Sequence, residues 1–398
     1  MRNTKRFTSL AAVAMLGLMA AACGSSDDAA STATDAPAAT GAPGATTAPD
    51  ATTAPGGTTA PDGTSAPAAS GPKVGLVFDI GGRGDQSFND SAAAGIERAQ
   101  SELGITFTEA SPNDDGSNRK ELLDLAAESS DIVIAVGFLF EADAAAVGKS
   151  NPDKTFGVVD SAMLDFSDTS KPEGVPYGDN IAGLVFSEEQ GSFLVGAAAA
   201  LKSTSGHIGF IGGVKGVGGL IEKFEAGYKA GAKAVNPDIV VDANYITEAP
   251  DFDGFNAPDR GRDIATAMYD GGADIVYSAA GGSGAGVFEA AKASSEAKGS
   301  KVWAIGVDSD QYNTSDPAVK DYILTSMIKR VDVAVFEIIK AQMDGNVKGG
   351  PTRYDLSVDG VGYSTSGGFI DDITSKLDAY KADIISGKIV VPTDPTKV

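Results

Sequence analysis

From Lys73 to the C-terminus, short apolar runs alternate with segments whose apolar residues recur at helical spacing. The first run is Val74–Phe78, and apolar positions at helical spacing follow at Ala92, Ile96 and Ala99. Further runs that we interpret as strands span 105–108, 132–136, 155–159, 208–211, 240–246, 275–277 and 302–307. Because neighbouring parallel strands need a crossover connection, usually a helix, this alternation predicts parallel sheets with helices on both faces.

The number of predicted strands favours two sheets over one very wide sheet, since twisted sheets rarely exceed about 10 strands. Roughly half of the predicted strands precede a break near 179–188, and the other half follow it. We therefore expect an α/β fold of two doubly wound parallel-sheet lobes joined by three crossovers, near 179–188, 326–330 and 350–355. The expected boundaries place residues 73–183 and 329–355 in lobe 1, and residues 184–328 and 356–398 in lobe 2.

The N-terminus has the pattern of a secretory signal over residues 1–22. Cationic residues in Met1–Arg6 precede the uncharged segment Phe7–Ala22, which ends in three alanines before Cys23. The apolar segment is short for a membrane span, which needs about 20 residues. Small residues before a cysteine resemble the lipobox of bacterial lipoproteins, whose processing leaves a diacylated N-terminal cysteine. This resemblance implies lipidation of Cys23 and a location on the outer leaflet of the cytoplasmic membrane; an ordinary signal peptide is the alternative.

A linker is predicted between Cys23 and residue 72. It consists almost wholly of Ala, Thr, Pro, Gly, Ser and Asp and contains no aromatic residue. Such a composition cannot bury enough apolar surface to offset the entropy of ordering, so we expect disorder. A tether that lets the folded body reach a membrane-bound partner and a glycosylated stalk both fit this composition.

Charge and residue counts limit the classes of function. The 54 acidic and 31 basic residues give a net charge of −23, which repels phosphate backbones, so we expect no nucleic-acid partner. The only histidine, His207, stands at the edge of a predicted strand, where a surface or strand-edge role is expected. No spacing of His, Cys or carboxylates resembles a zinc or calcium site. We therefore expect no enzyme, no cofactor and no metal.

Candidate ligand contacts follow the predicted strands, because ligands of open α/β sheets bind beyond the carboxyl ends of the strands. These candidates are acids, two phenylalanines, one amide and one lysine: Asp85, Phe88, Asn89, Asp160, Phe224, Asp308 and Lys329. Together they suit an uncharged polar ligand with a flat ring. Structural roles are the alternatives: core packing for the phenylalanines, helix caps for Asp160 and Asp308, and a surface charge for Lys329.

Six motifs in one order give the chain a family resemblance from about Lys73 to Thr393. They are Gly84–Asn89, Glu189–Gly196, Gly209–Gly213, Lys223–Tyr228, Gly306–Gln311 and Thr325–Arg330. With them the chain resembles the basic membrane protein or purine nucleoside receptor family of periplasmic-binding-protein-like lipoproteins, which serve ABC transporters. The resemblance implies a type I periplasmic-binding-protein fold with the ligand cleft between the lobes, a permease as partner, and a monomer.

The resemblance also implies roles for the candidate residues. Phe88 and Phe224 would sandwich a purine from opposite lobes, and Asp160 and Asn89 would bond its edge. Asp308, Lys329 and the Gly282 loop would hold the ribose.

Three departures from the family pattern leave the ligand open: the composition of the loop 214–219, Gln86 and Tyr228. A purine nucleoside is the favoured ligand, and a sugar, an autoinducer or another small polar solute is the alternative. A surface nucleoside hydrolase is less favoured.

Overall fold

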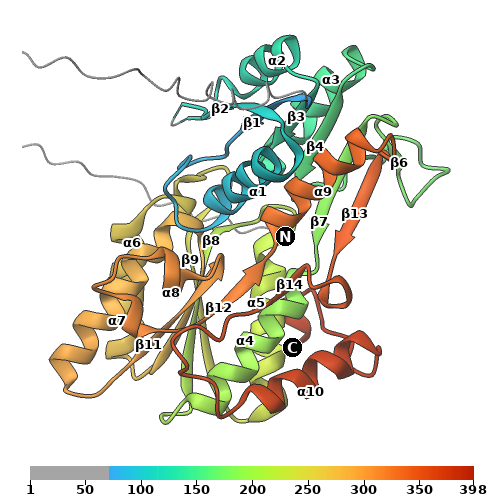
Figure 1. The fold of residues 1–398 in the computed structure, drawn as a ribbon. Helices are drawn as coiled ribbons and strands as arrows, with labels where there is room; N and C mark the ends of the chain where they lie inside the picture. Colours follow the sequence, from blue (N-terminus) through green and yellow to red (C-terminus); the bar gives the residue numbers. More distant parts are fainter. Residues whose placement is uncertain (1–70, 114) are drawn as a thin grey trace, which may run out of the picture. The chain divides into compact units, whose positions relative to one another are not determined.

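Two six-stranded sheets form the core of the protein in a computed structural model that describes residues 71–113 and 115–398 (Figure 1). All of these residues belong to one compact unit. The predicted signal, Cys23 and the predicted linker as far as residue 70 lie outside the described residues. Within the described part, no helix combines the length and apolar character needed to cross a membrane.

The first sheet is entirely parallel, with the strand order β13-β7-β4-β3-β1-β2. Its strands are β1 Lys73–Val77, β2 Thr106–Ala110, β3 Ile132–Ala135, β4 Thr155–Val159, β7 Ile181–Phe186 and β13 Gly350–Tyr354. Its helices are α1 Phe88–Leu103, α2 Arg119–Ser129, α3 Glu141–Ser150 and α9 Val331–Met343. Val74 and Leu76 of β1 belong to the same core cluster as α1 and α9, whereas Val77 belongs to the cluster of α2 and α3. Alternate side chains of the strand therefore pack on opposite faces.

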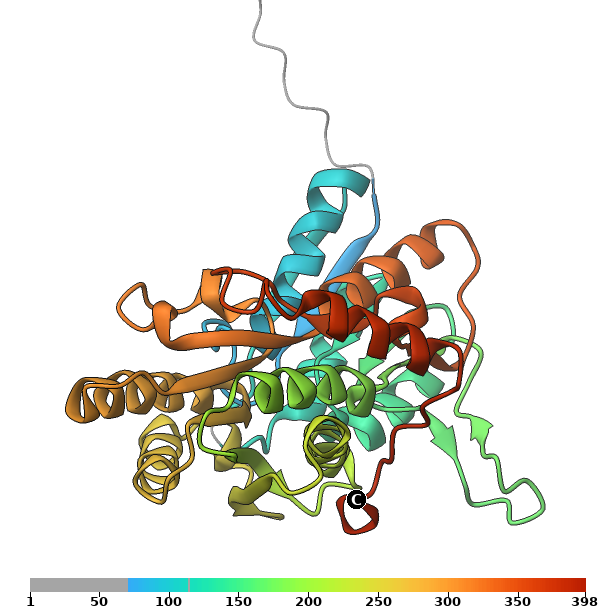
Figure 2. The same cartoon turned by 90° about the horizontal axis from the view of Figure 1, so that it is seen from below.

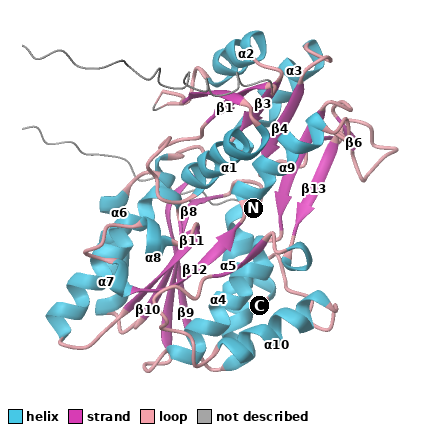
Figure 3. Cartoon of the chain, viewed as in Figure 1, coloured by secondary structure: helices cyan, strands magenta, loops and turns pink. Residues whose placement is uncertain are grey.

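The second sheet has the order β14-β12-β11-β10-β8-β9, and only its edge strand β14 is antiparallel. Its strands are β8 His207–Lys215, β9 Val240–Glu248, β10 Ile275–Ala279, β11 Trp303–Asp308, β12 Ile323–Lys329 and β14 Val361–Tyr363. The associated helices are α4 Glu188–Lys202, α5 Leu220–Val235, α6 Pro258–Asp270, α7 Gly284–Lys298, α8 Gln311–Thr314 and α10 Thr374–Ile385. Figure 3 shows these helices, in cyan, beside the magenta strands.

Short elements complete the described chain. The two-residue strands β5 Leu164–Asp165 and β6 Val175–Pro176 form an antiparallel hairpin that extends away from the first sheet (Figure 2). The 3-10 turns are η1 Phe138–Phe140, η2 Asp253–Phe255, η3 Gly281–Ser283, η4 Lys320–Tyr322, η5 Leu356–Val358 and η6 Pro395–Lys397.

Helices α4 and α5 lie close together because glycines stand where their backbones meet. A Cβ on Gly227 of α5 would overlap the carbonyl of Glu189, and a Cβ on Gly231 would overlap the carbonyl of Phe193. This close approach fixes the start of α5, which carries Phe224, against the start of α4. The motif Lys223–Tyr228 therefore has a packing role as well as its predicted ligand role.

The predicted α/β fold class is confirmed, since helices connect the strands of both sheets and all strands but the edge strand β14 are parallel. The chain passes between the sheets after β7, after β12 and after β13. These three passages fall within the expected segments 179–188, 326–330 and 350–355, each of which also contains residues of the preceding strand β7, β12 or β13. The expected lobe boundary at residue 183 falls inside β7, and the division into lobes stays a prediction.

Candidate ligand-binding site

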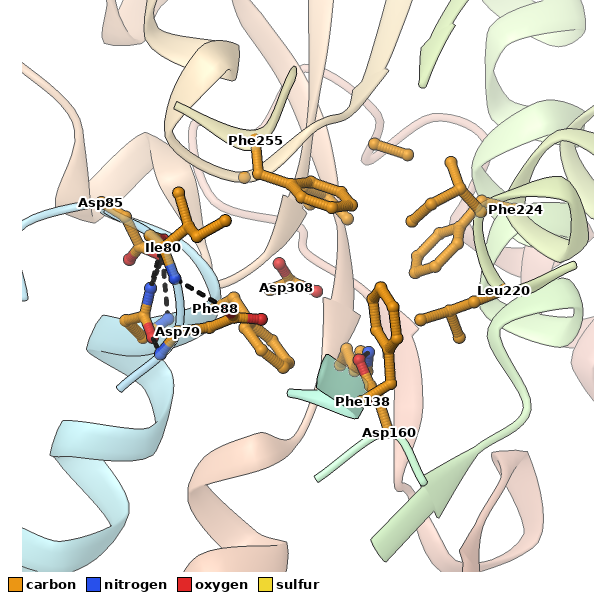
Figure 4. Close-up of a pocket in the computed structure, with 16 residues that line it drawn as sticks. Asp79, Ile80, Asp85, Phe88, Phe138, Asp160, Leu220, Phe224, Phe255 and Asp308 are labelled. Atoms are coloured by element: carbon orange, nitrogen blue, oxygen red, sulfur yellow. Dashed lines mark hydrogen bonds and ion pairs between the residues drawn. The ribbon is translucent and has the colours of Figure 1, made fainter. Parts of the chain in front are cut away.

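A cavity lies where the carboxyl ends of strands from both sheets meet (Figure 4). The centre of a water molecule can occupy about 60 Å³ of this cavity. Since each water needs roughly 10–15 Å³ of such volume, the cavity has room for several waters. Its walls carry acids, apolar side chains and one ammonium group: Asp79, Ile80, Asp85, Phe88, Asn89, Phe138, Asp160, Leu220, Ile221, Phe224, Phe255, Ala279, Gly281, Val307, Asp308 and Lys329. Seven of the eight residues predicted from the sequence are among them.

The eighth, Gly282, does not line the cavity, although its neighbour Gly281 does. Both belong to η3, the turn between β10 and α7. A Cβ on Gly282 would lie 3.6 Å from Cβ of Asp85. The loop that was predicted to hold the ligand therefore reaches the cavity through Gly281.

Asp85 builds the start of α1. Its carboxylate accepts hydrogen bonds from the backbone N–H groups of Ser87 (2.9 Å), Asn89 (2.8 Å) and Asp90 (3.1 Å). Such bonds satisfy the free donors at a helix N-terminus. Burial raises the pKa of Asp85, although these N–H groups oppose the shift. The carboxylate is thus occupied by its own loop, and its role in ligand binding stays a prediction.

Asn89 is similarly engaged. Its Oδ1 accepts the N–H of Asp79 at 2.9 Å, and its Nδ2 donates to the Ile80 carbonyl at 3.3 Å and to Asp85 Oδ2 at 3.1 Å. The side chain is buried, and both ends of the amide have protein partners. Asn89 therefore shapes the loop that carries Asp79 and Asp85, whatever it contributes to a ligand.

Lys329, at the end of β12, is buried rather than on the surface, with 2% of its side chain exposed. Its Nζ donates to Asp160 Oδ2 at 2.6 Å and lies 3.7 Å from Glu188 Oε1. Burial lowers its pKa, but the nearby carboxylates outweigh burial and raise the pKa above the ordinary lysine value. Lys329 is therefore a cation at neutral pH, held by Asp160 and Glu188.

Two aspartates end strands in the same strained conformation. Asp160, after β4, and Asp308, at the end of β11, both have φ of 63°, in the left-handed region. Asp160 Oδ1 is buried without a hydrogen-bond partner among the described residues, which leaves one acceptor open at the cavity. Asp308 Oδ2 accepts from Ser87 Oγ at 2.7 Å. Backbone strain of this kind is often found where side chains must point into a site.

Burial changes the protonation of the cavity acids. It raises the pKa of Asp308 to about 6, against the opposing effects of Lys329 and the Ser87 hydroxyl. It also raises the pKa of Asp79 to about 6, against the opposing effects of the Ile80 N–H and, after it, of Arg119. At neutral pH both carboxylates are ionised and can accept hydrogen bonds from a ligand.

Aromatic rings surround the ammonium group of Lys329. Its Nζ lies 4.9 Å from the ring centroid of Phe88, 5.0 Å from that of Phe186 and 5.7 Å from that of Phe224. Phe88 begins α1 beside the first sheet, and Phe224 lies on α5 beside the second. The two phenylalanines predicted to contact a ring thus come from different sheets and line the same cavity.

Sequence reasoning missed nine of the sixteen cavity residues, among them Asp79, Phe138 and Phe255. Asp79 and Phe138 follow β1 and β3 within three residues, so the rule about strand ends could have found them. Phe255 lies in η2, far from any strand end, and no sequence pattern marks it. Phe138 contacts Phe252, which precedes η2, edge to face with centroids 6.4 Å apart, so this contact joins the elements of the two sheets.

Hydrogen bonds also connect the loop before α1 to the second sheet. Ser87 Oγ donates to Asp308, the Ser309 hydroxyl donates to the Ser87 carbonyl at 2.9 Å, and Gln311 Nε2 donates to the Gln86 carbonyl at 3.0 Å. Gln86 has φ of 56°. The loop, which follows β1 of the first sheet, is thus bonded to the end of β11 and to α8, elements of the second sheet.

The described part of the chain has neither a metal-ligand cluster nor a histidine at the cavity. No group of three or more His, Cys, Asp or Glu side chains there could hold a metal ion. His207 lies at the start of β8, where its Nε2 is 2.7 Å from Asp242 Oδ2, and it does not line the cavity.

Comparison with known proteins decides the family. The profile of the family described as "ABC transporter substrate-binding protein PnrA-like" matches residues 72–395. The chain belongs to this family. Its members are extracytoplasmic substrate-binding proteins of ABC transporters, so the protein is a solute-binding protein and not an enzyme, as predicted.

Relatives and solved structures agree with the family. "ABC transporter nucleoside-binding protein BmpA" of Lactococcus lactis is 35% identical, over 81% of this chain and 89% of its own length. "CD4+ T-cell-stimulating antigen" of Listeria monocytogenes is also 35% identical, over 81% and 88%. The crystal structure of a solute-binding protein from Aeropyrum pernix superposes with a TM-score of 0.68 at 28% identity, over 81% of this chain and 94% of that chain. The predicted type I fold is therefore confirmed.

Proposed function

We propose that this solute-binding protein captures a purine nucleoside in the cavity and delivers it to an ABC transporter permease. The observation that carries the proposal is the position of Phe88 and Phe224, which come from different sheets and line one cavity together with a buried ammonium group and carboxylates. Stacking on aromatic rings contributes about 1–3 kcal/mol per base. The relative from Lactococcus lactis is named as a nucleoside-binding protein, which supports the same ligand class.

The polar residues suit the rest of such a ligand. The open oxygen of Asp160 accepts a hydrogen bond from a ring N–H or an exocyclic amine. The Asp308 carboxylate and the Lys329 ammonium group bind ribose hydroxyls, as acceptor and donor. Because ligand contacts come from elements of both sheets, a bound ligand favours the closed arrangement of the two lobes, which the permease recognises.

The ligand can be identified directly. Full-length protein is purified without added solutes, and the small molecules released on denaturation are analysed by mass spectrometry. Calorimetry with inosine, guanosine and adenosine then measures affinity, and X-ray scattering measures compaction. A purine nucleoside that binds and compacts the protein is the expected result. A sugar or autoinducer in the released fraction, without binding heat for nucleosides, contradicts the proposal, and release of free base would indicate a hydrolase.

We also propose that Cys23 is lipidated and holds the protein on the outer leaflet of the cytoplasmic membrane. The apolar segment and small residues before Cys23 support this anchor. Two acyl chains, at about 0.8 kcal/mol per buried methylene, give stable attachment. Cys23→Ser should move the protein from the membrane fraction to the medium or periplasm. Retention of the variant in membranes would contradict the lipid anchor without affecting the proposed ligand.

A further inference from the structure

Arg119, the first residue of α2, has a buried guanidinium group behind the cavity wall. Only 12% of its side chain is exposed, and its Nη2 lies 3.7 Å from Asp79 Oδ1. Nη1 donates to the Gly116 carbonyl at 3.3 Å, but Nε and Nη2 are buried without a hydrogen-bond partner among the described residues. Burying an ionised group is costly unless an opposite charge compensates it. The nearby Asp79 carboxylate provides that compensation.

Asp79 lines the cavity (Figure 4), whereas Arg119, which contacts Asp79, is not among the lining residues. Asp79 Oδ1, on the side of Arg119, accepts the N–H of Ile80 at 2.8 Å, and the backbone N–H of Asp79 is held by Asn89. Oδ2 accepts no hydrogen bond from the described residues. It lies against Gly137, where any Cβ would overlap it. One oxygen of Asp79 is therefore held on the side of Arg119, while the other remains available as an acceptor.

We propose that Arg119 is a positioning residue that keeps Asp79 ionised and oriented, so that Asp79 accepts a hydrogen bond from an N–H or O–H group of the ligand. This inference rests on the proposed function of the cavity. The charged groups that face Asp79 are Arg119 on α2, Asp160 after β4 and Asp85 in the loop before α1. Both aspartates oppose a negative charge on Asp79, and Arg119 is the cation among these groups.

The direct test is the titration of Asp79 in the ligand-free, full-length protein. Aspartate carboxyl carbons are labelled with ¹³C, the Asp79 resonance is assigned by its loss in Asp79→Asn, and the midpoint is followed by NMR. Since an opposite charge at this distance lowers a carboxyl pKa by about 1–3, Arg119→Gln should raise the midpoint by about one pH unit or more. Arg119→Lys should stay close to the native midpoint, because it keeps the charge.

The matched control is Arg262→Gln, on α6, where Arg262 pairs with the exposed Asp259 and Glu289 instead of a cavity acid. It should leave the Asp79 midpoint unchanged. Should Arg119→Gln fail to fold, Arg119→Met keeps the aliphatic stem and carries the same expectation. A midpoint that does not move when the guanidinium group is removed overturns the proposal.

Calorimetry with inosine near pH 6.5 tests the consequence for binding. With the Asp79 midpoint raised by about one to two pH units, the ionised fraction at pH 6.5 falls roughly 3- to 25-fold, and Arg119→Gln should bind inosine more weakly by the same factor. In the Asp79→Asn background the same substitution should change affinity less than about 2-fold. A raised midpoint with unchanged affinity overturns the contact between Asp79 and the ligand. If native protein binds no purine nucleoside, the proposed ligand is wrong, and the titration still decides the role of Arg119.

Discussion

The buried ammonium group of Lys329 gives a prediction whose size follows from the structure. Lys329→Met keeps most of the side-chain volume but removes the cation that lies 2.6 Å from Asp160. The same cation lies 3.7 Å from Glu188, which Lys223 also contacts at 3.4 Å. Removing one partner of a buried ion pair costs about 3–5 kcal/mol, because the remaining charge stays buried without compensation. At about 2.1 cal/mol/K per residue over the described chain, this loss lowers Tm by about 4–7 °C.

The stability lost in Lys329→Met should depend on pH, and the pKa shifts show whether the loss grows or shrinks as the pH rises. The pKa of Lys329 is raised in the folded protein, so its stabilisation is present below the ordinary lysine pKa of 10.5 and is lost only above it. Burial raises the pKa of Asp308 to about 6 and also raises that of Glu188. These acids begin to destabilise the fold when the pH rises above their pKa in the unfolded chain. The destabilisation is complete when the pH exceeds their pKa in the folded protein.

Without Lys329, these acids lose the cation that lowers their pKa and remain protonated to higher pH. The variant should therefore lose less stability at pH 5 than at pH 8, by about 1.4 kcal/mol for each pH unit over which one more carboxyl stays protonated. Unfolding by heat and by urea at both pH values measures this. Lys340→Met is the control, since Lys340 is exposed and pairs with Asp344, the residue that follows the same helix. If Lys329→Met is no less stable than this control at pH 8, or equally destabilised at both pH values, the reasoning is refuted.

Three further predictions concern the cavity. Phe224→Ala should weaken nucleoside binding by about 1–3 kcal/mol in calorimetry, whereas Phe166→Ala on the exposed hairpin should leave binding unchanged. Equal affinities of Phe224→Ala and native protein would remove Phe224 from the site. Affinity should fall from pH 7 to pH 5 as Asp308 and Asp79, each with a pKa of about 6, take up protons. Asp308→Asn should make this fall smaller, and a flat profile in native protein would contradict the prediction. Ser87→Ala removes a hydrogen bond between elements of the two sheets, worth about 1.5–3 kcal/mol to a charged acceptor, and should give a larger radius of gyration without ligand; an unchanged radius would show that this bond does not hold the lobes together.

Much of the site could be predicted because strand ends have a recognisable pattern. An apolar run followed directly by an acid or a lysine led to Asp160, Asp308 and Lys329, and all three line the cavity. The rule works because the carboxyl ends of parallel strands lie at the same edge of a sheet. The spacing of apolar residues likewise located α1 and most strands of both sheets, since burial imposes a period on each element.

The partners of these residues could not be predicted, because they depend on tertiary contacts. Nothing near Lys329 in the sequence indicates that Glu188, far away in the chain, contacts the same ammonium group. The amide of Asn89 and the carboxylate of Asp85 looked available for a ligand, yet the loop before α1 uses both. Arg119 belongs to a helix whose pattern is ordinary, and only the fold brings it behind Asp79.

The balance of charge in the cavity limits its ligand more strongly than its aromatic rings do. Asp79, Asp85, Asp160 and Asp308 line the cavity, and Lys329 is the one cation among the lining residues. Lys329 already contacts Asp160, so it cannot neutralise a further anion without leaving a buried carboxylate uncompensated. A phosphate group would add negative charge beside acids whose pKa is already raised by burial. The same fold could stack a nucleotide base equally well, so under the proposed function we expect the excess of carboxylates, rather than the rings, to favour an uncharged solute.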